Sequence, residues 1–210
     1  MDQPGQKWRY SITHDFLSAL IEIFSGMSTK DFLQERLFKP LEMIETYYNV
    51  PDDRQSRVVQ VYKYSEKDGL ATHFHYPPIA ENTVWQGKSG LFSTASDVKN
   101  FCQMLLNGGQ RNGVRILSRK TVEVMTINQT GELFGWPGYG FGLGFAVLND
   151  LAESKDLGSE GLFYWVGAYN THLAIDPREN LIVMFFAQRL PFDLNYHHQM
   201  LQLVYQAIVD

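Results

Sequence analysis

THLAIDPRENLIVMFFA, residues 171–187, is the stretch that decides the fold class. Its two ends, THLAID and LIVMFFA, are each long enough to form one β-strand. The segment between them, DPREN, combines Asp, Pro and Asn, as turns do. The sequence therefore predicts a β-hairpin. Because LIVMFFA is apolar at every position, we expect this strand to be covered on both faces by neighbouring layers.

Strand patterns precede this hairpin, and a helical pattern follows it. Residues 139–147 (YGFGLGFAV) alternate bulky residues with glycines, which is the period of a strand, and residues 162–167 (LFYWVG) read as another strand. The closing segment places four side chains at helical spacing: Tyr196, Met200, Val204 and Ala207. We expect this helix to cover one face of an antiparallel sheet, with His197 and His198 on its exposed side.

Helical patterns dominate the earlier part of the chain. THDFLSALIEIFSG, residues 13–26, ends at Gly26 and places four apolar side chains on one face: Phe16, Leu17, Leu20 and Phe24. Ser28 reads as the N-cap of a second helix, TKDFLQERLF, which Pro40 follows closely. Residues 57–64 (RVVQVYKY) form the one strand-like run in this part.

These patterns together predict an α+β fold, an α/β sandwich in which helices flank an antiparallel sheet. Two more helices are expected, one opening near Ser96 and one after Ser118. We expect residues 1–135 to form a mostly helical part, and residues 136–210 to form the antiparallel strands and the C-terminal helix of the same domain.

The composition limits the class of protein. Of the 210 residues, 44% are hydrophobic and 20% are charged, which is enough apolar material for a sizeable core. The net charge is −5 and no cluster of Lys and Arg occurs, so we expect no nucleic-acid partner. The longest apolar run is too short to span a membrane. Cys102 is the single cysteine, which excludes a disulfide framework.

The residues after Met1 show neither a basic nor an apolar leader region. We therefore expect no signal peptide in this chain. The protein could be located in the cytoplasm or in the periplasm, and the sequence does not distinguish the two.

Ser96 and Lys99 form a Ser-x-x-Lys pattern, which some serine hydrolases use to activate a nucleophile. A serine that opens an amphipathic helix is more often an N-cap, and we favour that interpretation. His73 and His75 would share a face in a strand, but no third ligand is suggested, so no metal or other cofactor is expected.

The sequence contains no Gly-x-Gly-x-x-Gly, the motif that binds dinucleotides. It also contains no Gly-x-Ser-x-Gly, the motif that carries the nucleophile of α/β-hydrolases. Three tryptophans either line a cleft or fill cores: Trp85, Trp136 and Trp165.

Five stretches, taken in order, resemble the serine β-lactamase-like family, which includes class C β-lactamases, D-alanyl-D-alanine carboxypeptidases and related esterases. The resemblance covers nearly the whole chain. The stretches are PGQKWRYS (4–11), KPLEMIET (39–46), GKSGLFSTASDVKNFCQMLLNGG (87–109), YGFGLGF (139–145) and FYWVGAYNTHLAIDP (163–177).

The resemblance implies a site of which this chain carries one portion. In the family a catalytic Ser-x-x-Lys precedes the tyrosine motif, which here begins at Tyr10, so we expect a C-terminal portion without the nucleophile. Ser96 would then be an ordinary helix start. Tyr10 would assist proton transfer. Ile12 stands where the family has an asparagine that binds substrate.

The resemblance also assigns residues 163–177 to the strands that edge the active site. Trp165-Val166-Gly167 would be the third sequence motif of the family's active site. Trp165 has no positive charge with which to bind the carboxylate of a β-lactam, which favours an ester- or amide-cleaving relative. Gly167 would let the substrate backbone approach, and the backbone N–H of Ala168 would be one oxyanion donor. Trp165, Gly167 and Tyr169 are the expected substrate contacts.

We therefore expect the C-terminal part of a hydrolase that cleaves a small ester or a peptidoglycan-type amide through an acyl-enzyme, and that is inactive alone. Two alternatives stay open: a non-catalytic assembly or binding module with the same fold, and a relocated Ser96–Lys99 nucleophile near Tyr10 or Ala168. Without the family's first strands the sheet would expose an edge and an apolar face, so we expect self-association or pairing with a complementing N-terminal half.

Overall fold

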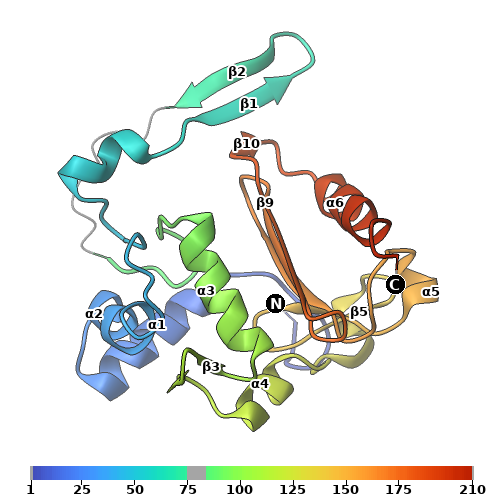
Figure 1. Cartoon of the computed structure of the whole chain (residues 1–210), viewed down its shortest axis with the longest axis horizontal. Coiled ribbons are helices and arrows are strands. Elements are labelled where there is room, and N and C mark those ends of the chain that lie inside the picture. Colours follow the sequence, from blue (N-terminus) through green and yellow to red (C-terminus); the bar gives the residue numbers. More distant parts are fainter. Residues whose placement is uncertain (1, 75–83, 210) are drawn as a thin grey trace. The chain divides into compact units, whose positions relative to one another are not determined.

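A computed structural model describes residues 2–74 and 84–209 (Figure 1). The chain folds into two compact units, and each is built from separate stretches of sequence. The first unit comprises residues 1–9, 60–74 and 117–210, and the second comprises residues 10–59 and 75–116. The mixture of helices and antiparallel strands confirms the expected α+β class. A single division between residues 135 and 136 remains a prediction.

A five-stranded antiparallel sheet forms the centre of the first unit, in the order β5-β6-β7-β8-β9. Its strands are β5 (Tyr139–Phe141), β6 (Ala146–Leu148), β7 (Phe163–Gly167), β8 (Thr171–Asp176) and β9 (Leu181–Phe186). The hairpin predicted from residues 171–187 is confirmed, because β8 and β9 pair along their whole length, from Thr171 opposite Phe186 to Asp176 opposite Leu181.

Two expectations about these strands are wrong. Residues 139–147 form a hairpin and not one strand, because Gly144 adopts a φ of 99° that turns the chain between β5 and β6. β9 is not covered on both faces: Val183 is buried, but Phe185 and Phe186 are 38% and 37% exposed. Among the described residues β9 pairs only with β8, so it is an edge strand with a partly open surface.

Helix α6 (Asn195–Tyr205) packs against the sheet, as Figure 1 shows. Leu201 is fully buried there, in a core shared with Tyr164 and Ala174. His197 is also fully buried, and its ring stacks on Tyr164 with 3.8 Å between ring centroids. The expectation that His197 lies on the exposed side is therefore wrong, since His197 and Leu201 lie one helical turn apart on the face that meets the sheet.

The rest of the first unit consists of short elements. A three-stranded sheet has the order β10-β1-β2, with β1 (Val61–Ser65) antiparallel to β2 (Gly69–Phe74) and parallel to β10 (Arg189–Leu190). The strand expected over 57–64 thus begins at Val61. Three helical turns complete the unit: α4 (Arg119–Met125), η3 (Gly131–Phe134) and α5 (Leu151–Ser154).

The second unit is mostly helical. Its elements are α1 (Thr13–Ser25), α2 (Thr29–Leu33) with η1 (Gln34–Phe38) directly after it, η2 (Asp52–Arg57), α3 (Ala95–Leu106), β3 (Gln110–Arg111) and β4 (Val114–Arg115). The predicted helix ends are confirmed: Gly26 closes α1 with a φ of 68°, and the Ser28 side chain caps α2 by accepting a hydrogen bond from the Asp31 N–H.

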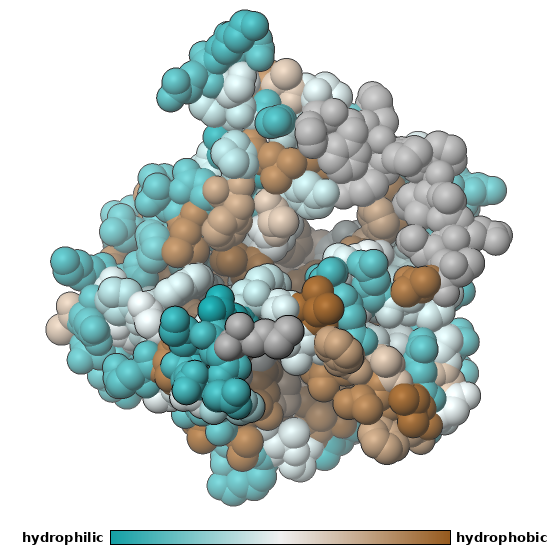
Figure 2. All heavy atoms as spheres, turned by 180° about the vertical axis from the view of Figure 1, so that it is seen from behind, coloured by the Kyte–Doolittle hydropathy of each residue, from teal (hydrophilic) through white to brown (hydrophobic). Residues whose placement is uncertain are grey.

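Helix α1 has an exposed apolar face. Phe16, Ile23 and Phe24 are 64%, 72% and 83% exposed, and Ser18 is the one buried residue of the helix. Figure 2 shows hydrophobic side chains gathered toward the lower right of the face viewed from behind. An amphipathic helix normally buries this face. In the described part of the chain, no helix combines the length and the apolar character needed to cross a bilayer.

Candidate active site

The turn between β7 and β8 carries the predicted oxyanion donor. Of the residues of β7, only Phe163 and Tyr164 pair with β6, whereas β8 stays paired with β7 as far as Gly167. Ala168 follows directly; its side chain is exposed, and its backbone N–H has no acceptor among the described residues. A backbone N–H held on a rigid strand end, with no internal partner, can donate to a developing oxyanion.

Asn170 fixes this turn, and the sequence prediction missed it. The residue is fully buried with a φ of 59°, and its N–H donates to the Gly167 carbonyl oxygen at 3.0 Å. Its Nδ2 donates to the carbonyl oxygens of Arg189 (2.7 Å) and Pro191 (3.0 Å), and its Oδ1 accepts from the Asp193 N–H at 2.8 Å. An Asn in a short strand connection was the available signal, because Asn tolerates this left-handed conformation.

Gly167 is required by its neighbour Thr171. A Cβ atom at Gly167 would lie 2.2 Å from Thr171 Oγ1, far inside van der Waals contact. The glycine therefore allows β7 to lie close to β8, its partner in the hairpin. This close approach also sets the direction of the backbone from Gly167 to Ala168.

An aromatic cluster surrounds Trp165. The Trp165 ring stacks on Trp136, with centroids 6.3 Å apart and planes inclined by 12°, and meets the edge of Phe141 at 5.2 Å. Trp8 packs on Phe141 at 5.1 Å. Trp136 and Trp165 are thus brought together, and both pack against the core while staying partly exposed. Trp85, the third tryptophan in question, belongs to the second unit.

Tyr10, the predicted proton-transfer residue, belongs to the second unit, whereas Ala168 belongs to the first. Its side chain is 59% exposed, so Tyr10 is not a core residue of that unit. Ile12 occupies the N-cap position of α1 and supplies no side-chain hydrogen bond there. An asparagine side chain at an N-cap can accept a hydrogen bond from the first turn of a helix, whereas isoleucine cannot.

The stretch GKSG holds the helix that follows Tyr10. A Cβ atom at Gly87 would lie 2.0 Å from the His14 carbonyl oxygen, so only glycine allows this close approach to α1. The Lys88 N–H donates to Asp15 Oδ1 at 3.2 Å, and Lys88 Nζ lies 3.4 Å from Asp15 Oδ2. These contacts fix the first turn of α1.

Asp97, and not Ser96, is the structural residue of STASD. The N-cap of α3 is Thr94, whose side chain accepts from the Asp97 N–H, so the interpretation of Ser96 as the cap is wrong by two positions. The buried Asp97 carboxylate accepts from the Glu45 N–H and from Thr46 Oγ1, both at 2.8 Å. Asp97 therefore joins the stretches KPLEMIET and STASD.

Ser96 and Lys99 do not form an activated pair. Both side chains are exposed, and neither makes a hydrogen bond or ion pair with any described residue. A serine nucleophile needs a base within hydrogen-bond reach, so this geometry argues against the relocated nucleophile. His75 lies outside the described residues; across the described ranges no cluster of three potential metal ligands occurs.

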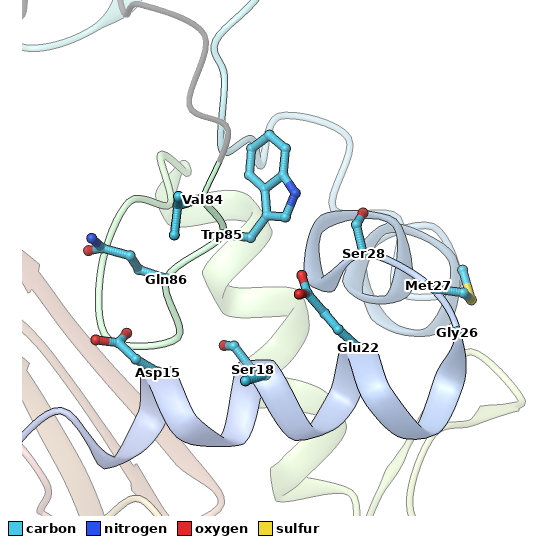
Figure 3. A pocket seen from close by; sticks show the side chains of 10 residues that line it. Asp15, Ser18, Glu22, Gly26, Met27, Ser28, Val84, Trp85 and Gln86 are labelled. Carbon is cyan, nitrogen blue, oxygen red and sulfur yellow. The ribbon is translucent and has the colours of Figure 1, made fainter.

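A pocket of about 670 Å³ opens in the second unit between α1 and residues 84–86 (Figure 3). Asp15, Glu22 and Trp85 line it. Its acidic groups have partners: Lys88 binds Asp15, and Glu22 Oε1 accepts from the Thr29 N–H at 2.9 Å. Ser18 Oγ donates to the His14 carbonyl oxygen. The pocket thus presents no nucleophile with a base beside it.

Beside α6, a buried hydrogen-bond network joins three titratable groups. Asp156 accepts from Tyr139 OH at 2.6 Å and lies 2.6 Å from His198 Nδ1. Burial opposes ionisation of Asp156, but these two hydrogen bonds lower its pKa, and the same carboxylate raises the pKa of His198. Burial lowers the pKa of His197 to about 3. This network anchors α6 and lies apart from the Ala168 turn in sequence.

Comparison with known proteins places these features in a family. The family model described as Beta-lactamase matches residues 1–205. An uncharacterized protein of Mycobacterium tuberculosis is 33% identical over 203 residues, covering 90% of this chain and 50% of that protein. In Escherichia coli K12, a protein named "Putative D-alanyl-D-alanine carboxypeptidase" is 24% identical, covering 89% of this chain and 46% of that protein. The chain spans about half the length of these curated relatives.

Solved structures share the fold at lower identity. Simvastatin synthase from Aspergillus terreus superposes with a TM-score of 0.84 at 20% identity, over 100% of this chain and 58% of that one. EstCE1, described as a hydrolase with promiscuous acyltransferase activity, gives a TM-score of 0.81 at 22% identity, over 97% and 57%. An octameric penicillin-binding protein homologue from Pyrococcus abyssi gives 0.72 at 21%, over 97% and 43%.

Proposed function

Because the chain belongs to the β-lactamase family, we propose that it supplies the strand and tyrosine portion of a serine hydrolase that cleaves an ester or a peptidoglycan-type amide through an acyl-enzyme. The observation that carries the proposal is the Ala168 N–H. It has no acceptor among the described residues and stands at the end of β7, on a turn that Asn170 holds by five hydrogen bonds, one of them from the Ala187 N–H to the Asn170 carbonyl oxygen.

The proposed reaction assigns each step to a group. A serine Oγ attacks the carbonyl carbon, and the oxygen of the tetrahedral intermediate takes up negative charge beside the Ala168 N–H. Tyr10 takes the proton of the serine hydroxyl during this attack and passes it to the leaving alcohol or amine when the bond to the carbonyl carbon breaks. Water then attacks the acyl carbon and gives a proton, through Tyr10, to the serine Oγ, so that the acid and the free serine are released. The serine is proposed to lie outside these 210 residues, since the one Ser-x-x-Lys here, Ser96–Lys99, is not activated.

A non-catalytic binding or assembly module is the second candidate. Ile12 favours it, because an alkyl side chain cannot make the substrate hydrogen bond of an amide. The exposed apolar face of α1 favours it too, since such a face normally meets a partner.

The open edge of β9 and the apolar face of α1 support one further proposal, that this chain associates with more protein. The partner is a complementing half or a second copy. The relative from Pyrococcus abyssi is octameric, which is consistent with self-association.

The first step of the test is to read the codons upstream of Met1 and to look for an in-frame Ser-x-x-Lys. We expect the protein extended to include it to gain one stoichiometric fluorophosphonate adduct on that serine. Replacing Tyr10 by phenylalanine should slow labelling by about 10²-fold or more, as for loss of a proton-transfer group, while Tyr47→Phe serves as the matched control. An extended protein that takes up no adduct, or a Tyr10→Phe variant that reacts normally, would contradict the proposal.

A further inference from the structure

Two histidine rings are buried between α6 and the central sheet without a hydrogen-bond partner. His197 on α6 and His172 on β8 are fully buried, and none of their four ring nitrogens has a partner among the described residues. The Tyr164 hydroxyl on β7, also fully buried, has none within the same ranges. Buried polar atoms are nearly always paired in proteins, so unpaired groups gathered in one place indicate a role other than stability.

These three rings form one continuous stack. The ring centroids of Tyr164 and His197 lie 3.8 Å apart with planes inclined by 19°, and those of His197 and His172 lie 5.8 Å apart with planes inclined by 17°. Burial lowers the pKa of both histidines, to about 3 for His197, so both rings are neutral at pH 7. A proton on either ring would place a positive charge inside the core.

The titratable groups around the stack do not favour such a charge. Burial, and the positive charges that His172 and His198 can carry, oppose a proton on His197 more strongly than Asp156 favours it. Asp156 pairs instead with His198, whose Nδ1 lies 2.6 Å from Asp156 Oδ1, and accepts from the Tyr139 hydroxyl. This pairing raises the pKa of His198, so His198 stabilises the docked helix at low pH and offsets part of the effect of the buried pair.

The stack also contacts the segment that holds the turn after β7. His172 stacks on Phe192, with ring centroids 6.4 Å apart and planes inclined by 22°. On the two sides of Phe192, the Pro191 carbonyl oxygen accepts from Asn170 Nδ2 at 3.0 Å, and the Asp193 N–H donates to Asn170 Oδ1 at 2.8 Å. This segment joins β10 to α6. A displacement of α6 would therefore act directly on the side chain that fixes the proposed oxyanion donor.

We propose that His172 and His197 form an acid-sensitive switch of the proposed active site. A proton on either ring releases α6 from the sheet, moves Phe192 and its neighbours away from Asn170, and so loosens the turn that positions the Ala168 N–H. This inference rests on the proposed function, because it concerns the regulation of the same oxyanion donor.

The expected size of the effect follows from proton linkage. When α6 leaves the sheet, His197 is exposed to water and its pKa returns from about 3 to the ordinary value of 6.5, so release is favoured progressively as pH falls below 6.5. Between pH 7.5 and pH 5 this difference alone favours the released state by about 30-fold. His172 adds to the effect and His198 opposes it, so we expect about tenfold or more.

Amide hydrogen exchange measures this release without catalysis. Protection factors of the 210-residue chain, corrected for the intrinsic exchange rate at each pH, are compared at pH 7.5 and pH 5. We expect the amides of α6 and of Asn170 to lose protection together by about tenfold or more, while amides of α3 in the second unit change little.

Variants identify the titrating groups. His197→Phe and His172→Phe keep an aromatic ring in the stack but remove its titrating nitrogens. Each should reduce the pH-dependent loss of protection, and the double variant should abolish it. His14→Gln, which changes a histidine of the second unit, is the matched control and should leave the loss unchanged. Circular dichroism and urea unfolding at pH 7.5 establish that each variant is folded before its protection factors are compared.

An equal loss of protection in the double variant, or a loss that extends equally to α3, would overturn the switch, because acid would then act on the whole fold. Loss of protection in α6 with an unchanged Asn170 amide would overturn its coupling to the turn. Fluorophosphonate labelling of the extended protein tests the catalytic proposal independently. Failed labelling together with an acid-sensitive α6 would overturn the proposed function alone, and labelling together with an insensitive α6 would overturn the switch alone.

Discussion

Gly167→Ala is the substitution whose effect can be worked out most fully. The added Cβ would lie 2.2 Å from Thr171 Oγ1, whereas ordinary van der Waals contact begins at 3.4 Å. The atoms must therefore separate by roughly 1 Å, which requires either rotation of the Thr171 side chain away from its present rotamer or a shift of β7 against β8. Overpacking of this kind costs about 1–3 kcal/mol of unfolding free energy.

Thr171→Ala provides a matched rescue. Without the hydroxyl, the nearest atoms to a Cβ at position 167 are Thr171 Cβ at 3.6 Å and the Thr171 carbonyl oxygen at 3.8 Å, both ordinary contacts. The double variant should therefore recover most of the loss, apart from up to about 1 kcal/mol for replacing a β-branched residue in a strand.

Urea unfolding of the four proteins in this cycle, followed by tryptophan fluorescence, gives the coupling free energy. We expect about 1–2 kcal/mol of coupling between the two sites. The reasoning is refuted if Gly167→Ala costs the same with and without the Thr171 hydroxyl, because the close approach at this atom would then not be the reason for the glycine.

Three further changes have expected outcomes. His197 has a pKa lowered to about 3, so its neutral form stabilises the fold above the unfolded pKa near 6.5 and this stability is lost as pH falls. His197→Phe should therefore remove about 2 kcal/mol of the stability difference between pH 7.5 and pH 5, measured by urea unfolding, and an unchanged difference would contradict it. His198, with its pKa raised by Asp156, acts in the opposite direction and loses its contribution as pH rises. Asp97→Ala should cost about 1–3 kcal/mol, because the part-buried Glu45 N–H loses its acceptor and Thr46 Oγ1 keeps only Ser93 Oγ as a partner, whereas exposed Ser96→Ala should stay within about 0.5 kcal/mol; equal effects of the two substitutions would contradict the structural role of Asp97. Cys102 is fully buried with its pKa raised to about 12, so a thiol reagent at pH 8 should modify it only after unfolding, and rapid modification of the native chain would contradict its burial.

The sequence predicted what local periodicity and capping determine. The hairpin at 171–187 and the end of α1 at Gly26 follow from short patterns, and the structure confirms both. The glycines of residues 139–147 produce a strand period and a turn equally well, so the hairpin there needed the positive φ of Gly144 to be recognised. His197 was misplaced because its burial depends on Tyr164, which is 33 residues away and contributes an aromatic face.

The candidate site was predicted only in part for the same reason. Resemblance pointed to Ala168, but the missing acceptor of its N–H and the side-chain hydrogen bonds of Asn170 to residues 189–193 are tertiary features.

We propose that these 210 residues hold the oxyanion and tyrosine elements of a serine hydrolase but no working nucleophile. Intact-mass analysis of the purified chain after exposure to a fluorophosphonate tests this most directly, with an active serine hydrolase as positive control in the same mixture. The account predicts an unchanged mass for the 210-residue chain. One stoichiometric adduct, mapped to a serine such as Ser96, would contradict it.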